Sequence, residues 1–570
     1  MKPLIKIIIF LLMFLFVVSC AAKQVNVLEE KPLPSKDAYY MYILGYNAEK
    51  EGMWEDALEY YNNALKMDPS SVYIKTQISF MLLRTGKVAD AISLAEEIIK
   101  TEPDYIPALM LLGELYNSKK RTEESIKMYE KVLKIQPDNQ EAALFVSVLY
   151  ASRQEYDKAI EVLEKLVKIY PDNIMAIYYL GSINIDKGDI EKASEYFQKA
   201  IAQRPNFDAA YFNLGLISEI KGNLKEAEEY YSKAVAINPH NLQAKDRLAQ
   251  TYFRQKEVDK AIKQFKEIIA QVPTNIDVHI KLGILYFEDK QYDRAIEEFR
   301  IVLEARPDDA AIRYYLAISL EGIGRDEEAI SELKKIILQE PKNLSAFFHL
   351  GYLYSKLNRD DDAIGVYEEI LSFEKEKPDV YLYLAVTYLH KKEYAKAETT
   401  LRDALSRFKD HDELNFNLAI VLEKTNRFEE MVRYLNKVIE INPKHADALN
   451  YLGYSYAEKG INLEEAHSLI NRALDLKPDS GYIIDSLGWV YYKLGKLDDA
   501  LKNLIRASEI VKDDPVIFEH LGDVYNSMDQ KENAKKYWEK AIEFHEKEEG
   551  LKERVEKKIK ELGHGEGEKR

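Results

Sequence analysis

Prolines recur along much of the chain at one fixed interval. They lie 34 residues apart at Pro69, Pro103, Pro137, Pro171, Pro205, Pro239, Pro273, Pro307 and Pro341. Eight equal spacings do not arise by chance, and a fixed period of this length is typical of repeat arrays. Proline ends a helix because it lacks an N–H and its ring clashes with the preceding turn. The spacing therefore predicts one short helical unit per 34 residues, rather than the several separate cores that 570 residues would otherwise suggest.

Other residue types keep the same period. A Leu-Gly pair lies nine and ten residues after many of the prolines, and an alanine follows thirteen residues after the leucine. The segment "AAYFNLGLISEIKGNLKEAEEYYSKAVAINP" shows the pattern at Tyr211, Leu214, Gly215, Ala227, Tyr231, Ala234 and Pro239. This pattern resembles the tetratricopeptide repeat (TPR). The resemblance implies two antiparallel helices per repeat, with glycine or alanine where the helices approach closely.

The leucine position can be followed as far as residue 521, which gives about fifteen repeats over residues 37–545. We therefore expect an all-α fold, an α-solenoid superhelix of stacked helix hairpins. One interval is 35 residues long, and the extra residue falls in "EKGINLEEA", at the turn between two helices. For residues 546–570 we expect a capping helix and a charged tail, because "LKERVEKKIKEL" places Leu551, Val555, Ile559 and Leu562 on one helical face. The alternative is a helix that docks a partner.

Residues 1–19 have the features of a signal peptide. Lys2 and Lys6 are followed by twelve apolar residues, which is shorter than the roughly 20 residues that span a bilayer as a helix. Val17-Val18-Ser19-Cys20 resembles the lipobox of bacterial lipoproteins, and Cys20 is the only cysteine. The resemblance implies cleavage before Cys20 and a membrane anchor through acyl chains on that residue. Two or three acyl chains hold a protein stably at a bilayer, whereas one holds it only marginally. A short membrane anchor or a buried N-terminal helix is the alternative.

The residues after Cys20 bear on the membrane to which the chain would attach. In lipoproteins of two-membrane bacteria, an aspartate directly after the cysteine tends to retain the protein at the inner membrane. Ala21 and Ala22 stand there instead, so the resemblance implies the outer membrane, facing the periplasm. The following residues are polar and include two prolines, which predicts that residues 20–36 form the lipidated N-terminus and a short tether.

Composition and motifs argue against several classes of function. The single cysteine excludes an intrachain disulfide and a multi-cysteine metal site. The net charge of −17 disfavours a nucleic-acid partner, which would need clustered Lys and Arg. The ten histidines form no HExxH motif, acidic pairs lie on solvated helix faces, and no glycine-rich phosphate loop occurs. We expect no enzyme, no cofactor and no metal, and a surface role for His390.

The TPR resemblance also implies a concave groove lined by the first helix of each repeat. Residues two before and two or five after the signature leucine tend to face that groove. The aromatic residues at these places are Tyr42, Tyr46, Phe80, Tyr178, Phe212, Phe253, Phe287, Tyr314, Phe348, Tyr352, Phe416, Tyr454, Trp489 and Tyr492. A long apolar row indicates a surface that binds other proteins or extended peptide segments. The alternative is that these rings are packed between helices and covered.

Together these features favour a lipid-anchored scaffold of the cell envelope. Lipoproteins that it resembles serve the assembly of envelope, secretion, pilus or exopolysaccharide machinery. One alternative is a regulatory adaptor that docks a cell-wall enzyme. Another is a carbohydrate-guiding protein, because aromatic rows can stack sugars.

Overall fold

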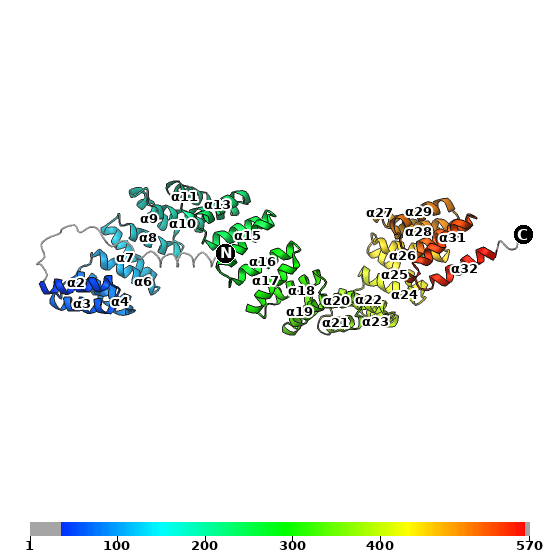
Figure 1. Cartoon of the computed structure of the whole chain (residues 1–570), viewed down its shortest axis with the longest axis horizontal. Coiled ribbons are helices and arrows are strands. Elements are labelled where there is room, and N and C mark those ends of the chain that lie inside the picture. The colour runs from blue at the N-terminus through cyan, green and yellow to red at the C-terminus, as the bar shows by residue number, and fades with distance from the viewer. Residues whose placement is uncertain (1–35, 565–570) are drawn as a thin grey trace. The chain divides into compact units, whose positions relative to one another are not determined.

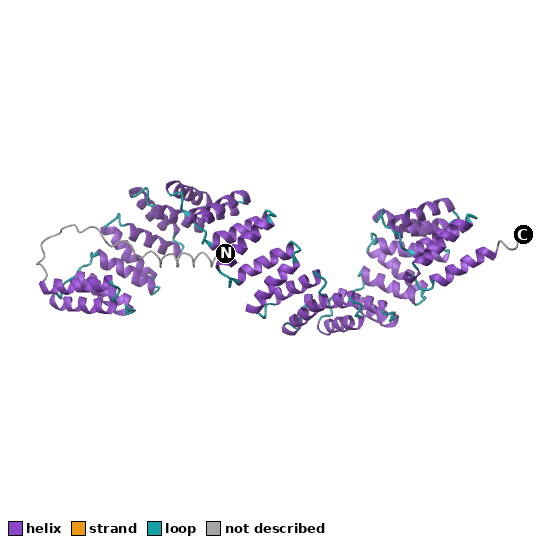
Figure 2. Cartoon of the chain, in the orientation of Figure 1, coloured by secondary structure: helices purple, strands orange, loops and turns teal. Residues whose placement is uncertain are grey.

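The computed structural model describes residues 36–564. The expected signal peptide, Cys20, nearly all of the tether and the last residues of the tail lie outside this range. Every regular element within it is helical, and it contains no strand (Figure 2). None of the described helices is both long enough and apolar enough to cross a membrane.

The chain forms two compact units, which meet in the sequence between Gln271 and Val272. The first unit holds α2 (Lys36–Lys50), α3 (Trp54–Met67), α4 (Val72–Arg84), α5 (Val88–Thr101), α6 (Ile106–Ser118), α7 (Thr122–Ile135), α8 (Gln140–Ser152), α9 (Tyr156–Ile169), α10 (Ile174–Lys187), α11 (Ile190–Gln203), α12 (Asp208–Ile220), α13 (Leu224–Ile237), α14 (Leu242–Arg254) and α15 (Val258–Gln271).

The second unit begins with α16 (Ile276–Glu288), α17 (Tyr292–Ala305), α18 (Ala310–Gly322), α19 (Asp326–Gln339), α20 (Leu344–Lys356), α21 (Asp360–Phe373), α22 (Pro378–His390) and α23 (Tyr394–Arg407). It continues with α24 (Asp412–Lys424), α25 (Phe428–Ile441), α26 (Ala446–Lys459), α27 (Leu463–Leu476), α28 (Gly481–Lys493), α29 (Leu497–Ile510), α30 (Pro515–Ser527), α31 (Lys531–Glu543), a short 3₁₀ helix (His545–Lys547) and α32 (Leu551–His564).

Consecutive helices pair as hairpins from α2–α3 to α30–α31, which confirms the expected fifteen repeats (Figure 1). We call the first helix of each hairpin helix A and the second helix B. The prolines fall in the turns after helix B, as Pro341 does between α19 and α20. In that turn Asn343 caps α20, because its Oδ1 accepts a hydrogen bond from the Ala346 N–H at 3.0 Å.

The recurring glycine of helix A marks the closest contact within a hairpin. A Cβ added to Gly351 would lie 2.6 Å from Cε1 of Tyr367 on the facing helix B. At Gly215 the corresponding distance, to Cε1 of Tyr231, is 2.5 Å. Glycine is therefore needed because an aromatic ring from helix B lies directly against the backbone of helix A.

The predicted insertion lies at the end of one helix A. Helix α26 has 14 residues, whereas most A helices have 13, and three residues connect it to α27. Two of those three, Gly460 and Asn462, adopt left-handed backbone angles with φ of 69° and 48°. The extra residue is accommodated there, at the end of α26.

The C-terminal helix α32 covers the end of the second unit. Leu551 and Val555 are buried, and Ile559 and Leu562 pack against the same cluster. Phe518 and Trp538 of the last hairpin belong to that cluster. Val555 lies 34 residues after Leu521, so α32 continues the period as a helix A, and no helix B follows it within residues 36–564. This confirms the predicted capping helix.

Candidate interaction surface

The structure gives different environments to the fourteen aromatic residues predicted to face the groove. Tyr46 and Tyr352 are exposed, and Trp489 is buried. The other eleven are half-buried: Tyr42, Phe80, Tyr178, Phe212, Phe253, Phe287, Tyr314, Phe348, Phe416, Tyr454 and Tyr492. The row is therefore not uniformly open to solvent.

Most of the half-buried rings are held by aromatic neighbours. Phe212 packs on Tyr231 of helix B in the same hairpin, with ring centroids 5.8 Å apart. The ring of Tyr42 lies 5.4 Å from that of Tyr61, and the Tyr42 hydroxyl is 3.0 Å from the hydroxyl of Tyr73 in the next repeat. These rings therefore contribute to packing and remain partly exposed.

The second unit has a patch where apolar side chains are clearly exposed. Tyr352 of α20 is 53% exposed and Tyr383 of α22 is 47% exposed, and Val386 of α22 is also exposed. We call these three residues the central aromatic patch. They come from α20 and α22, the A helices of two adjacent repeats.

Neighbouring rings hold Tyr383 of the central aromatic patch in place. The Tyr383 ring stacks on Tyr367 of α21, with centroids 5.9 Å apart and an interplanar angle of 26°. Phe348 meets the same ring edge-on at 6.0 Å. An exposed tyrosine that is fixed on two sides loses little conformational entropy when a partner covers it.

One side of the patch is polar. Tyr352 lies beside His349, with ring centroids 6.2 Å apart, and Tyr314 meets His349 edge-on at 5.6 Å. His349 Nε2 lies 2.7 Å from a carboxylate oxygen of Glu321. An apolar centre with a polar rim is the usual anatomy of a protein interface.

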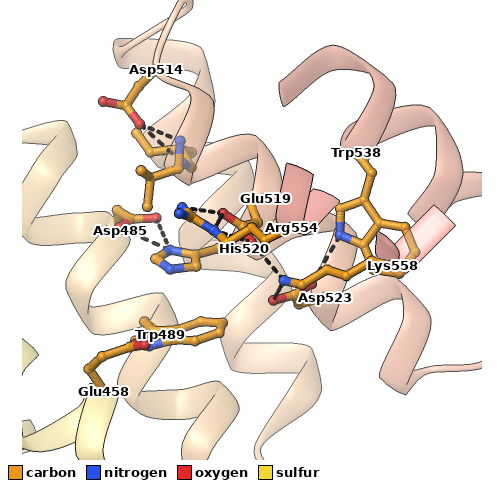
Figure 3. Close-up of polar contacts among 12 residues, drawn as sticks. Glu458, Asp485, Trp489, Asp514, Glu519, His520, Asp523, Trp538, Arg554 and Lys558 are labelled. Carbon is orange, nitrogen blue, oxygen red and sulfur yellow. Dashed lines mark hydrogen bonds and ion pairs between the residues drawn. The ribbon is translucent and has the colours of Figure 1, made fainter. Parts of the chain in front are cut away.

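Trp489 takes part in a buried polar network of the last repeats (Figure 3). Its indole N–H donates to Glu458 at 2.7 Å, and its ring stacks on His520 at a centroid distance of 3.9 Å. His520 Nδ1 is 2.9 Å from Asp485 Oδ1, and both residues are buried. Trp489 therefore faces the A helix of the next repeat, and it is packed between helices rather than open in the groove, which is the alternative that the sequence left for these rings.

The charges around His520 control its protonation. Burial alone would lower its pKa, but the Asp485 carboxylate raises it through its charge and its hydrogen bond. The charges of Asp523 and Glu519 act in the same direction. The pKa of His520 therefore lies above its ordinary value, which favours the imidazolium form.

Two basic side chains of α32 complete the network. Arg554 binds both carboxylate oxygens of the buried Glu519, at 2.8 to 3.0 Å. Lys558 reaches Glu519 at 2.8 Å and Asp523 at 2.7 Å, and Asp523 also accepts the indole N–H of Trp538 at 3.0 Å. Burial would raise the pKa of Glu519, but the hydrogen bonds from Arg554 and Lys558 lower it on balance. The sequence did not point to these residues, because charged side chains on helix faces are usually solvated.

The network attaches α32 to α30 through paired charges. Its carboxylates are engaged with the indole, imidazole, guanidinium and ammonium groups just described. Within residues 36–564, no group of three or more His, Cys, Asp and Glu side chains is arranged to hold a metal ion. His390, expected at the surface, is exposed at the end of α22 and pairs with Asp360 at 2.7 Å.

Comparison with known families agrees with the hairpin architecture. A model described as the N-terminal ARM repeat of tetratricopeptide repeat protein 21 matches residues 48–262. Models described as tetratricopeptide or TPR repeats match residues 286–351, 346–381, 379–411, 412–445, 434–468, 488–529 and 517–547. No curated relative matches the chain.

Several solved structures are similar to parts of the chain. A crystal structure of MamA is 31% identical and covers 28% of this chain and 93% of its own, with a TM-score of 0.26. The Cut9 and Hcn1 hetero-tetramer of APC/C is 15% identical over 86% of this chain and 97% of its own, with a TM-score of 0.34. A tetratricopeptide repeat protein from Parabacteroides merdae is 21% identical over 44% and 98%, with a TM-score of 0.30. The family matches and the stacked hairpins together show that this chain is a tetratricopeptide-repeat α-solenoid.

Proposed function

We propose that this chain is a lipid-anchored scaffold of the bacterial cell envelope that binds other proteins through the concave side of its repeats. Its partners would be proteins or extended peptide segments of an envelope, secretion, pilus or exopolysaccharide assembly. Tetratricopeptide arrays are typically non-catalytic, and we assign no reaction to this one. The observation that carries the proposal is the central aromatic patch of Tyr352, Tyr383 and Val386.

The chemistry of the patch favours a protein partner. Tyrosine is enriched among the anchor residues of protein interfaces, because it offers a large apolar surface with a polar tip. Exposed apolar side chains from adjacent elements mark interaction sites more often than single exposed ones do. Lys356, four residues after Tyr352 on α20, is paired with Glu321 and Asp326. Contacts along a partner segment are therefore a better fit than a clamp on a C-terminal carboxylate.

The lipid anchor rests on the sequence around Cys20. A basic start, twelve apolar residues and the lipobox-like Val17-Val18-Ser19-Cys20 occur in the order that lipoprotein processing requires. Ala21 and Ala22 favour the outer membrane, with the repeats in the periplasm.

Photo-crosslinking in intact cells tests the scaffold proposal. A photoreactive phenylalanine at position 352 is compared with one at position 482, because Tyr482 is a tyrosine of similar exposure on α28 of the same unit. We expect adducts with one protein or a small set of proteins at position 352 and none at position 482. Equal adducts at both positions, or none at position 352, would contradict the proposal. Recovery of a single cell-wall enzyme would favour the adaptor, and retention of glycan without any protein would favour the carbohydrate-guiding alternative.

The anchor is tested separately by the substitution Cys20→Ser. The wild-type protein should partition into the detergent phase, whereas the variant should remain in the aqueous phase or keep its uncleaved leader. Equal membrane retention of the two processed proteins would contradict a lipid anchor on Cys20.

A further inference from the structure

We infer that one side of α2, the first helix of the repeat array, is a membrane-contact surface that lies on the bilayer interface. This face, which we call the end face, consists of Tyr39, Tyr40, Ile43 and Tyr46. The inference deepens the proposed function, since it depends on the lipid anchor to bring the end face to the membrane.

One position of helix A is exposed in the first repeat and buried in the later ones. Tyr40 lies four residues before the leucine position of its repeat and is 59% exposed. The residue at this position is buried in every later repeat, as Ile74, Ala210 and Ile517 illustrate. Helix B of the preceding hairpin packs there in a solenoid. For α2 no preceding hairpin exists within residues 36–564, so its stacking side is uncovered.

The side chains of the end face differ from those expected on an uncovered end. A terminal repeat that faces only water needs a polar outer surface. Here Tyr40 is exposed on that side. Tyr39, Ile43 and Tyr46 are exposed beside it, at positions that also stay open in some later repeats, and the spacing of three and four residues places all four on one side of α2. The surface combines large apolar bodies with hydroxyl tips.

Lysines flank this aromatic surface at both ends of the helix. Lys36 is exposed at the first residue of α2, and Lys50 is the last residue. The Lys50 ammonium lies 5.3 Å from the ring centroid of Tyr46. A row of tyrosines between two lysines fits the interfacial region of a bilayer, where tyrosine rings sit at headgroup level and lysines at helix ends extend their ammonium groups to the headgroups.

The length of the connecting chain favours the bilayer over other occupants. Fifteen residues, 21–35, separate Cys20 from α2. Fully extended, they span at most about 50 Å. An acyl anchor at Cys20 would therefore keep the end face close to the membrane, and this tethering raises the effective concentration of lipid at a weak contact surface.

A fluorophore quenching experiment on the full-length lipidated protein tests this inference. Cys20 is the only cysteine, and acylation would block its thiol, so an introduced cysteine can be labelled selectively. Tyr39→Cys probes the end face, and Tyr482→Cys is the matched control. Both tyrosines are five residues before the leucine position of their repeats, with 58% and 59% exposure. Each variant carries an environment-sensitive dye and is reconstituted into phosphatidylethanolamine and phosphatidylglycerol vesicles that contain a nitroxide-labelled lipid.

We expect a loss of dye fluorescence at position 39 and no loss at position 482. Adding Tyr40→Ser and Ile43→Ser to the labelled Tyr39→Cys protein should restore much of the fluorescence. Equal fluorescence at positions 39 and 482 would overturn the inference, and dimerisation through α2 in that case would identify a second copy of the chain as the occupant.

Labelling of the wild-type protein with the dye shows whether a failure lies with the lipid anchor or with the end face. If its Cys20 accepts dye, the lipid anchor is wrong, and quenching is then measured in a Cys20→Ser background. Quenching at position 39 there would still support the end face, and its absence would overturn it. If Cys20 is blocked and position 39 is not quenched, the anchor stands and the end face fails.

Discussion

Trp489 lies face to face on His520, with ring centroids 3.9 Å apart and ring planes inclined by 16° (Figure 3). The two residues belong to α28 and α30, the A helices of consecutive repeats. Asp485 of α28 holds the other side of the contact by its bond to His520 Nδ1. The stack therefore joins two repeats through polar and aromatic contacts in addition to the usual apolar packing.

The first prediction concerns the pH dependence of this contact. Because the pKa of His520 is raised in the folded protein, the His520–Asp485 pair stabilises the fold fully below the unfolded value of about 6.5. That contribution is lost as the pH rises through the raised pKa. Asp485→Asn should therefore cost about 1.5–3 kcal/mol near pH 6 and less at higher pH. Urea unfolding followed by tryptophan fluorescence at several pH values measures the difference.

A pair of the same type with an exposed histidine is the control for this pH dependence. His390 is paired with Asp360 at 2.7 Å, and the side chains are 61% and 16% exposed, respectively. Because water screens an ion pair whose histidine is exposed, Asp360→Asn should change the unfolding free energy by less than about 1 kcal/mol at every pH. A loss of stability in Asp485→Asn that stays constant between pH 6 and 9 would contradict the account of His520.

The second prediction concerns the attachment of α32. Arg554→Gln with Lys558→Gln removes both cations that face the buried Glu519. The loss should weaken the docking of α32 by about 1–3 kcal/mol, since both cations are themselves partly exposed. Hydrogen exchange of α32 should accelerate, and limited proteolysis near Gly550 should increase.

Substitution of a neighbouring lysine is the control that distinguishes the loss of positive charge from the loss of contacts that attach α32. Lys557 is exposed and pairs with Glu561 of its own helix, at 3.9 Å. Lys557→Gln should leave the exchange of α32 unchanged. Equal acceleration in the double variant and in Lys557→Gln would show that the carboxylates of α30 do not hold α32.

The third prediction compares two glycines of one hairpin. Gly351→Leu would force a side chain into the ring of Tyr367, and overpacking of this kind costs about 1–3 kcal/mol. Gly365 on α21 has open space around it, so Gly365→Leu should be neutral or stabilising by up to about 1 kcal/mol through helix propensity. Native-state hydrogen exchange should show the damage of Gly351→Leu in α20, α21 and their neighbours only. A uniform loss of protection along the second unit would contradict additive repeat stability.

The fold was predictable because one spacing rule specifies every hairpin. The interval between prolines placed the turns, and the leucine and glycine positions placed the inner sides of the helices. Even the extra residue beside Gly460 was located from the sequence, since a shift in phase can be traced to one segment. The rule works because each repeat packs only on its neighbours.

The exposure of individual groove residues was less predictable. Trp489 and Tyr352 occupy the same position of their repeats, yet Trp489 is buried and Tyr352 is exposed. The difference comes from the next repeat, where His520 covers Trp489 and Tyr383 leaves Tyr352 open. Tyr383 was missed because it directly precedes the leucine position, which was not expected to face the groove. A search for tyrosines at that position would have found it.

The polar network and the end face depend on contacts that no periodic pattern describes. From its place on a helix, Glu519 would be predicted to be a solvated acid, but Arg554 and Lys558 of α32 bind it in the structure. Tyr40 would be predicted to be a core residue from its position in the repeat. It is exposed because no hairpin precedes α2 within the described residues. Both cases occur at the ends of the array, where the neighbour that defines each environment changes.

The central claim, that the concave side binds a partner through the central aromatic patch, is tested most directly with Tyr352→Ser combined with Tyr383→Ser. Interface anchors of this kind contribute about 2 kcal/mol each, roughly thirtyfold in affinity, although such losses do not simply add. The affinity of the double variant for the protein crosslinked at position 352 is measured beside its thermal melt, with Tyr482→Ser as the control. The account predicts a normal melt for both proteins and a loss of binding only in the double variant. Unchanged affinity, or a melt that collapses in the double variant, would contradict it.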